Sequence, residues 1–407
     1  MKTANDLALH RLTHSDPHLL DIKPAREVVP GMHGRLILTS GAPMKWEEYT
    51  GGQRDAVLYG AVYEGLAKDV HAADAAIRRG EIEVATTQKH SCIGSVAGIF
   101  TASMPVLIVE DRATGRRGYC NLYEGANRKR LNYGSYDEDV VAGLRRLEHV
   151  IGPVMGEALR RHGPLQLQQL MARALRMGDE LHSRNSAATM LLVQELLPQW
   201  MDMAALSVKG LPETVAFLRD NDYSFLRVGM AAAKATVDAA HGIEGSSLVT
   251  GMAINCRTIG IRVSGLGDTW FTGPHPTLEG RFFENFGPDD VEWMGGESCT
   301  NECVGLGGFA QACAPTLQAY QGGTVARMCQ LNIEMYSIAR GEHPEFRIPA
   351  FDFRGTPVGI DVHLVVSTGI TPVIDGGLAG KGGGQIGAGV LRVPMAPFLA
   401  AAKALEA

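Results

Sequence analysis

The feature that most constrains the fold is a long helical segment in the middle of the chain. Between residues 137 and 240 almost the whole sequence has the apolar periodicity of helices, with breaks at Gly152-Pro153, Gly163-Pro164 and Gly210. The last run of this segment, Arg227 to Ala240, is rich in alanine, whose small side chains permit close packing. We therefore predict a central helical domain over residues 137–240.

Strand patterns lie on both sides of that segment. Short β-rich runs end at turns and are predicted as strands at residues 35–40, 82–86, 105–111, 117–122, 259–264, 362–367 and 371–375. Helices are predicted at residues 310–320 and 324–340. Many of the 49 glycines come late in the chain, where the backbone then needs positive φ angles or a close approach to a ligand. The prediction is an α+β fold with an N-terminal α/β lobe (1–136), the helical domain (137–240) and a glycine-rich α+β domain (241–407).

Composition excludes several classes of protein. A net charge of −6 argues against a nucleic-acid binder, which would need a basic surface. The N-terminus has no signal-peptide pattern, and no apolar run is long enough to span a bilayer, so a cytoplasmic protein is expected. Seven cysteines then remain reduced, and the spacing of Cys299, Cys303 and Cys313 matches no common metal pattern. We expect no metal, and we give Cys92 only a minor chance of acting as a nucleophile.

One polar run interrupts the helical segment. Within the eight residues from Gly178 to Asn185 the chain has two acids, a histidine, an arginine and an amide, with apolar helix predicted on both sides. On a helix, Glu180 and Arg184 would form an ordinary surface pair, and the histidine would be a satisfied structural residue. The alternative is a site where this helix meets the glycine-rich half. On that interpretation the candidate catalytic residues are His182, Glu180, Asp179 and Arg184.

Polar residues beside glycine turns are candidates for binding a substrate. Ser246 and Ser247 follow a glycine turn and could present backbone N–H groups and hydroxyls to an anion, particularly if Ser247 opens a helix. A plain helix cap explains Ser246 equally well. Arg262 and Asp268 flank a glycine turn, where an arginine can grip a carboxylate or phosphate. The glycine-rich loop 380–389 is either a flexible turn or part of an anion site. The predicted substrate-binding residues are Asn185, His90, Ser246, Ser247, Arg262, Asp268, Glu302, Arg354, Gly376, Gly377 and Gln385.

Several of these runs also carry a family resemblance. They include Met177 to Glu180, Arg184 to Thr189, Asp238 to Thr250, Arg262 to Asp268 and Asp352 to Pro357, in order along almost the whole chain. With these runs the sequence resembles the YlbE-like family, long catalogued as of unknown function. The resemblance implies an α+β protein with a central helical domain. It also implies a link to FdrA-like proteins, since family members are encoded beside them.

One member of that family looks like the AllG subunit of oxamate carbamoyltransferase, which exchanges a carbamoyl group between oxalurate and phosphate. Both reactants are anions, so this chemistry would need arginines, backbone N–H groups and one proton-transfer group. Arg184 and Arg262 suit the anions and His182 suits the proton, with Glu180 or Asp179 to orient the histidine.

The resulting expectation is an enzyme, or enzyme subunit, that moves a carbamoyl group of a small ureide or amide, with phosphate as co-substrate and no cofactor. A hydrolase of an amide or cyclic imide is one alternative. A non-catalytic partner of an FdrA-like subunit is another. A metal-dependent amidohydrolase using His90, Cys92 or His182 is the weakest, because no metal-binding helix motif is present. We further expect a homo-oligomer and no contact with a membrane.

Overall fold

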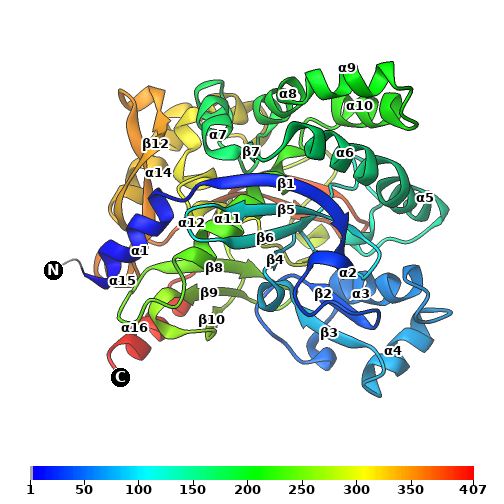
Figure 1. The fold of residues 1–407 in the computed structure, drawn as a ribbon. Coiled ribbons are helices and arrows are strands. Elements are labelled where there is room, and N and C mark those ends of the chain that lie inside the picture. Colours follow the sequence, from blue (N-terminus) through cyan, green and yellow to red (C-terminus); the bar gives the residue numbers. More distant parts are fainter. Residues whose placement is uncertain (1–2) are drawn as a thin grey trace.

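The computed structural model describes residues 3–407 and has a mixed α+β architecture, which confirms the predicted fold class (Figure 1). Its largest sheet has five strands in the order β4-β6-β5-β1-β7. β5 and β6 form the predicted antiparallel pair, and β1 connects them to β7. The strands span Pro17–Pro24 (β1), Cys92–Ile93 (β4), Pro105–Asp111 (β5), Arg116–Asn121 (β6) and Leu165–Gln166 (β7).

The alanine-rich helix α11 (Phe225–Ala239) packs directly on this sheet, against β5 and β6. All its residues from Phe225 to Val237 are buried. The helix and the sheet lie close together because Gly118 of β6 has no side chain at the contact. A Cβ added at Gly118 would lie 2.2 Å from the carbonyl oxygen of Ala231. Small side chains on both surfaces therefore let a helix backbone lie almost against a strand.

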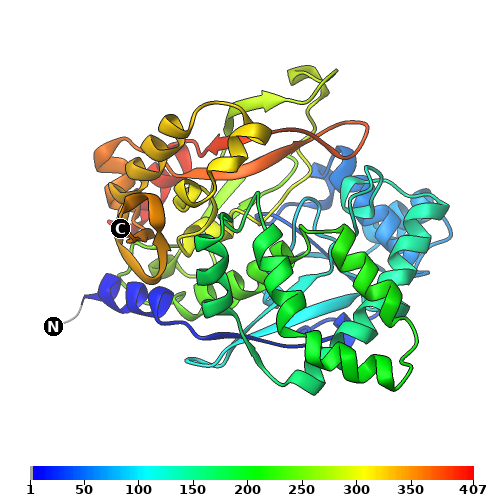
Figure 2. The ribbon, with the colours of Figure 1, turned by 90° about the horizontal axis from the view of Figure 1, so that it is seen from above.

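Of the remaining helices of the predicted helical domain, α6 and α7 pack against β1, whereas α8, α9 and α10 pack on other helices, farther from the sheet (Figures 1 and 2). The short strand β7 within this range is the fifth strand of the sheet. The division of the chain at residues 136 and 240 remains a prediction. These helices are α5 (Glu138–Arg146), α6 (Gly152–His162), α7 (Leu167–Arg176), α8 (Ser186–Glu195), α9 (Leu197–Ala205) and α10 (Leu211–Asp220), with a π-helical turn at Leu147–Ile151 between the first two.

A smaller unit is built from residues 25–86. The strands β2 and β3 run parallel, as strands joined by a helical crossover do. The core of this unit is apolar and separate from the main one, and includes Ile37, Val57 and Ile77. The elements are α2 (Ala25–Val28), β2 (Leu36–Thr39), α3 (Gly51–Tyr63), α4 (Val70–Arg78) and β3 (Glu83–Thr86).

The C-terminal part contains three small sheets with short helices between them. The strand orders are β10-β9-β8, β11-β15-β14 and β12-β13. Its strands are β8 (Val249–Ile254), β9 (Ile259–Val263), β10 (Trp270–Gly273), β11 (Thr277–Phe282), β12 (Ala339–Ile348), β13 (Arg354–Ile360), β14 (Val373–Ala379) and β15 (Gln385–Arg392). Its helices are α12 (Thr300–Cys303), α13 (Gln318–Gln321), α14 (Val325–Tyr336), α15 (Val362–Thr368) and α16 (Ala396–Leu405).

The N-terminal helix connects distant parts of the chain. α1 (Ala4–Thr13) packs against β12 and β13 rather than against the N-terminal sheet (Figure 1). The Asn5 side-chain amide donates to the Ser247 hydroxyl at 2.9 Å, and Arg11 Nη1 donates to the Ala239 carbonyl at 2.8 Å. The first residues of the structure thus fasten the helical segment to the C-terminal half. Within residues 3–407, no helix has the length and apolar character needed to cross a bilayer.

Three local predictions were wrong. The β-rich run at 362–367 is the helix α15, because the Asp361 carboxylate accepts the His363 N–H and caps its first turn, and Gly369 ends it at φ +71°. Residues 310–320 form 3₁₀ turns followed by α13 instead of one helix. Residues 177–185, expected on a helix, form a loop between α7 and α8, with Gly178 at φ +100° and Leu181 at φ +66°.

Candidate functional site

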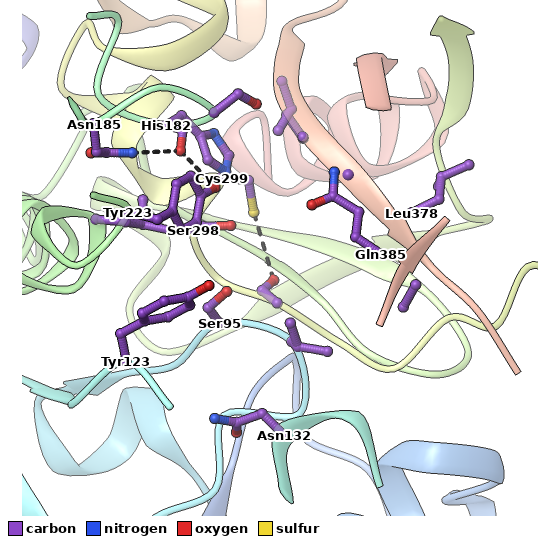
Figure 3. A pocket seen from close by; sticks show the side chains of 18 of the residues that line it. Ser95, Tyr123, Asn132, His182, Asn185, Tyr223, Ser298, Cys299, Leu378 and Gln385 are labelled. Carbon is purple, nitrogen blue, oxygen red and sulfur yellow. Dashed lines mark hydrogen bonds between the residues drawn. The ribbon is translucent and has the colours of Figure 1, made fainter. Parts of the chain in front are cut away.

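A pocket of about 540 Å³ lies where three parts of the chain meet. Residues 95–133 of the N-terminal part form one wall, the loop before α8 and the start of α11 form the second, and segments 292–299 and 374–391 form the third. Figure 3 shows side chains from all three parts turned toward the same space, including Ser95, Tyr123, His182 and Gln385. The volume is ample for two small ligands at once.

The loop between α7 and α8 is folded by two buried carboxylates. The Asp179 carboxylate accepts the Ala187 N–H at 3.2 Å and the Ala188 N–H at 2.8 Å, and so caps the start of α8. Glu180 accepts the backbone N–H groups of His182 and Ser183 on one oxygen and that of Arg184 on the other. Both side chains are fully buried and neither lines the pocket. The expected surface pair between Glu180 and Arg184 is therefore wrong.

His182 reaches the pocket from this loop with one ring nitrogen already bound. Its Nδ1 lies 2.8 Å from Oε1 of Glu302, which also accepts the Gly308 N–H and the Asp375 N–H at 3.0 Å each. Nε2 is then the ring nitrogen available to a ligand. Burial alone lowers the pKa of His182, but the Glu302 carboxylate and, less strongly, Glu180 outweigh it and hold that pKa above its ordinary value.

The backbone of His182 is held as firmly as its ring. The Asn185 amide donates to the His182 carbonyl at 2.9 Å, and the Tyr223 hydroxyl donates to the same oxygen at 2.8 Å (Figure 3). These contacts come from the loop itself and from the segment before α11. A fixed backbone and a fixed ring give the imidazole one orientation toward the pocket.

Three arginines line the pocket: Arg130, Arg184 and Arg227. Arg227 is only 4% exposed, and its Nη1 donates to Oδ1 of Asn121 at 2.9 Å. Arg130 lies against the rings of Tyr123 and Tyr133, at 5.4 and 4.5 Å from their centroids. In each guanidinium the Nε is buried and has no hydrogen-bond partner within residues 3–407.

The carboxylates in the pocket wall are bound to other donors. Glu124 accepts the Leu131 and Asn132 N–H groups, Asp222 accepts the Ser186 hydroxyl at 2.6 Å, and Glu292 accepts the Gly52 N–H at 3.1 Å. None of the three forms an ion pair with a pocket arginine in the described part of the chain. Nη1 of each arginine has a protein partner: the Gly125 carbonyl for Arg130, the Asp179 carboxylate at 3.7 Å for Arg184 and Asn121 for Arg227. The remaining guanidinium donors are available to anions that enter the pocket.

The structure brings only some of the predicted site residues together. His182, Arg184 and Asn185 line the pocket with Gly376, Gly377 and Gln385 from β14 and β15. Glu302 lies behind His182, and Asp179 and Glu180 lie beneath the loop. It is thus Glu302, and neither Asp179 nor Glu180, that contacts the imidazole ring of His182.

The other six predicted residues lie outside this pocket. Arg262 is buried against the Asp238 carboxylate at 2.7 Å, and Arg354 pairs with Glu342 on the surface. His90 Nδ1 contacts the Pro30 carbonyl at 2.7 Å. The remaining three are Ser246, which is fully buried, Ser247, which contacts Asn5, and Asp268, whose side chain is 93% exposed. Whether any of them binds a ligand elsewhere stays a prediction.

The sequence interpretation missed Arg130, Arg227 and the tyrosines around them. Arg227 had a detectable signal, because it is a charge among the small and apolar residues of the first turns of α11. Cys299 also lines the pocket. Burial, then the nearby Glu302 carboxylate, raise the pKa of the Cys299 thiol well above its ordinary value, which disfavours a reactive thiolate. Cys92 is buried outside the pocket, and burial raises its pKa as well.

Comparison with known proteins gives a consistent result. The family model of the oxamate carbamoyltransferase subunit AllG matches residues 82–298. The chain is 38% identical to the oxamate carbamoyltransferase subunit AllG of Escherichia coli K12 over 99% of this chain and 97% of that protein. It is 41% identical to the uncharacterized protein YahG of the same organism, over 97% of this chain and 84% of that one.

A solved structure agrees over the whole chain. A conserved protein of unknown function from Enterococcus faecalis V583 superposes with a TM-score of 0.94 at 38% identity, covering 99% of this chain and 97% of the other. The family resemblance carried by the sequence runs is thereby confirmed. The chain belongs to the family of the oxamate carbamoyltransferase subunit AllG.

Proposed function

We propose that this protein is an enzyme, or the subunit that carries the reacting site of one, and that it transfers a carbamoyl group between oxalurate and phosphate. The observation that carries the proposal is the convergence of Arg130, Arg184 and Arg227 on one pocket beside the free ring nitrogen of His182. Two anionic reactants need guanidinium donors to bind them, and the family relation supports the same substrates.

The reaction requires one nucleophilic attack and one proton transfer. A phosphate oxygen attacks the ureido carbonyl carbon of oxalurate, the bond from that carbon to the inner nitrogen breaks, and carbamoyl phosphate and oxamate result. The nitrogen that leaves must receive a proton. Protonated His182, with Nδ1 on Glu302, carries its second proton on Nε2, and its raised pKa favours this form. The arginines bind the substrate carboxylate and the phosphate and hold them close to each other.

The test is the turnover of oxalurate by the purified chain, alone and mixed with an FdrA-like partner, with and without phosphate. Carbamoyl phosphate and oxamate formed only when phosphate is present support the proposal. Phosphate-independent release of oxamate would indicate a C–N hydrolase instead. No turnover in either mixture would overturn the carbamoyl transfer and favour a non-catalytic role beside an FdrA-like subunit.

The proposed proton donor has its own test. Replacing His182 by glutamine preserves a donor for Glu302 but removes the acidic proton, so we expect turnover to fall about 10²- to 10⁴-fold. His71→Gln on the exposed face of α4 is the matched control, and its rate should equal that of the unchanged protein. Full activity of the His182→Gln variant would exclude His182 from the reaction.

A further inference from the structure

Behind His182, three carboxyl groups are buried together. Glu180, Glu302 and Asp375 have no exposed surface, and they come from the α7–α8 loop, α12 and β14. Of the three, only Glu302 has an ion-pair partner within the described residues, and that partner is His182. Three negative charges buried together repel one another strongly, because the protein interior screens them less than water does. They cannot all be ionised when a single imidazolium faces them.

Two carboxyl oxygens of this cluster are buried without a hydrogen-bond partner among the described residues, Oε2 of Glu302 and Oδ2 of Asp375. Glu302 is already paired with His182, so the contacts of Asp375 locate the missing proton. Oδ1 of Asp375 accepts the side-chain N–H groups of Gln311 at 2.5 Å and Gln321 at 3.2 Å. Oδ2 of the same residue is buried and receives no N–H or O–H from the described residues, although the Glu180 carboxyl interacts directly with Asp375. A buried carboxyl oxygen without a donor is costly. A proton held between the two carboxyls removes that cost.

We propose that Glu180 and Asp375 share one proton at neutral pH, and that Asp375 is a positioning residue that sets the charge state of His182. Asp375 does not face the pocket itself. Its N–H binds Oε1 of Glu302, the same oxygen that binds His182, and the next two residues, Gly376 and Gly377, line the pocket. This role of Asp375 rests on the proposed function, because Glu180 and Asp375 would then keep the proposed proton donor, His182, in its charged form.

The electrostatic environment agrees with this geometry. Burial first, then the Glu302 carboxylate, raise the pKa of Asp375 to about 7. Burial and the charge of Asp375 raise the pKa of Glu180 well above its ordinary value. The other titratable groups that face Glu180 are His182, Tyr223 and Cys313, and burial keeps the last two neutral by raising their pKa values. Gln311 and Gln321 contribute only neutral donors.

The sign of the coupling follows from the charges. When the pair loses its shared proton as pH rises, one more negative charge faces Glu302 and His182, and His182 keeps its own proton to higher pH. The asparagine in Asp375→Asn cannot gain that charge, so His182 should lose its proton at lower pH. Glu180→Gln should act in the same direction. Each single variant leaves one negative charge in the pair, whereas the double variant leaves none. The double variant should therefore shift the His182 titration by more than the sum of the two single shifts.

The experiment is an NMR titration of the histidine rings in the full chain, with the His182 signal assigned by its absence from His182→Gln. We expect the His182 midpoint to move to lower pH in Asp375→Asn, with no shift in the control Asp361→Asn, a buried aspartate that caps α15 outside the pocket. An unchanged midpoint in Asp375→Asn, or fully additive shifts in the double variant, would overturn the proposal.

A second measurement needs no variant. In the unchanged protein labelled at the aspartate carboxyl carbons, one resonance should titrate at about pH 7. If every aspartate titrates in the ordinary acidic range, the shared proton does not exist. Neither readout involves turnover, so these results stand apart from the oxalurate assay. A shifted His182 midpoint in a protein without carbamoyl transfer would overturn the proposed function and leave the carboxyl pair intact.

Discussion

At the scale of single residues, neighbours in the run from Asp179 to Asn185 make entirely different contacts. Asp179 and Glu180 point inward and bind backbone N–H groups, whereas His182 and Arg184 reach the pocket. The two acids hold the loop in the conformation in which His182 and Arg184 line the pocket. A cluster of polar residues in the sequence therefore locates the site but does not assign the roles within it.

Arg227 should contribute strongly to anion binding. Hydrogen bonds to charged groups contribute about 1.5–3 kcal/mol, so Arg227→Met should weaken the binding of phosphate or oxamate roughly 10- to 150-fold. The loss is expected because Arg227 is buried at the pocket and its Nε lacks a protein partner. Calorimetric titration measures the effect. Arg219→Met, on the surface and paired with Asp220, is the control and should bind as the unchanged protein does.

The raised pKa of His182 also predicts how stability depends on pH. The folded state binds this proton more tightly than the unfolded chain does, so the contribution to stability is complete below the ordinary value of 6.5. It is lost as pH rises through the raised pKa of the folded state. The melting temperature should therefore fall more between pH 6 and pH 9 for the unchanged protein than for His182→Gln. Equal falls in both proteins would contradict the raised pKa.

At the scale of elements, capping residues determine the secondary structure of short segments whose apolar periodicity does not decide it. The run at 362–367 has the β-branched residues of a strand, but Asp361 at one end and Gly369 at the other make it a helix. End residues also determine the loop 177–185. Gly178 has a positive φ angle, which ends the helical conformation, and the Asp179 carboxylate caps the first turn of α8. The residues at the ends of a short segment thus determine its secondary structure more than its apolar pattern does.

The cap of α8 is buried, and its removal should cost more than that of an exposed cap. Asp179→Ala leaves two buried N–H groups without partners, so we expect a loss of about 2–4 kcal/mol in the free energy of unfolding. Asp137→Ala removes the cap of α5, where the side chain accepts the Val140 N–H at the surface, and should cost about 1 kcal/mol. Urea unfolding followed by circular dichroism compares the two. Equal losses of unfolding free energy in the two variants would show that the buried cap of α8 contributes no more to stability than the exposed cap of α5.

At the scale of the whole molecule, the pocket belongs to no single part of the chain. Its walls come from residues 95–133, 182–227 and 292–391, and α1 fastens the N-terminus to the C-terminal sheets. Ligand binding should therefore stabilise the entire fold rather than one lobe.

Phosphate together with oxamate should raise the melting temperature in a single transition. A ligand at one hundred times its dissociation constant stabilises the folded state by roughly 2.7 kcal/mol. Differential scanning calorimetry with the two anions, against an equal concentration of chloride, measures the shift. The shift should be much smaller in Arg227→Met. Two separate transitions, only one of which moves with ligand, would contradict a pocket that unites the whole chain.

The sequence by itself determined the α+β class, the antiparallel pair β5–β6, the strands β2 and β3, and the family, because periodicity and turn residues act locally. It also located His182, Arg184 and Asn185, since a dense polar run between apolar helices needs partners wherever it lies. Arg227 could have been found by the same argument, as a charge among the small, apolar residues that begin α11.

Only the tertiary structure decided which distant residues meet. Arg130 and Arg227 are 97 positions apart and share one pocket, and Glu302 lies 120 positions from the ring that it orients. Arg262 has as favourable a local sequence as any of them, yet Asp238 neutralises it outside the pocket. Local patterns cannot foresee such pairings, because they depend on how the sheets and helices pack across the whole chain.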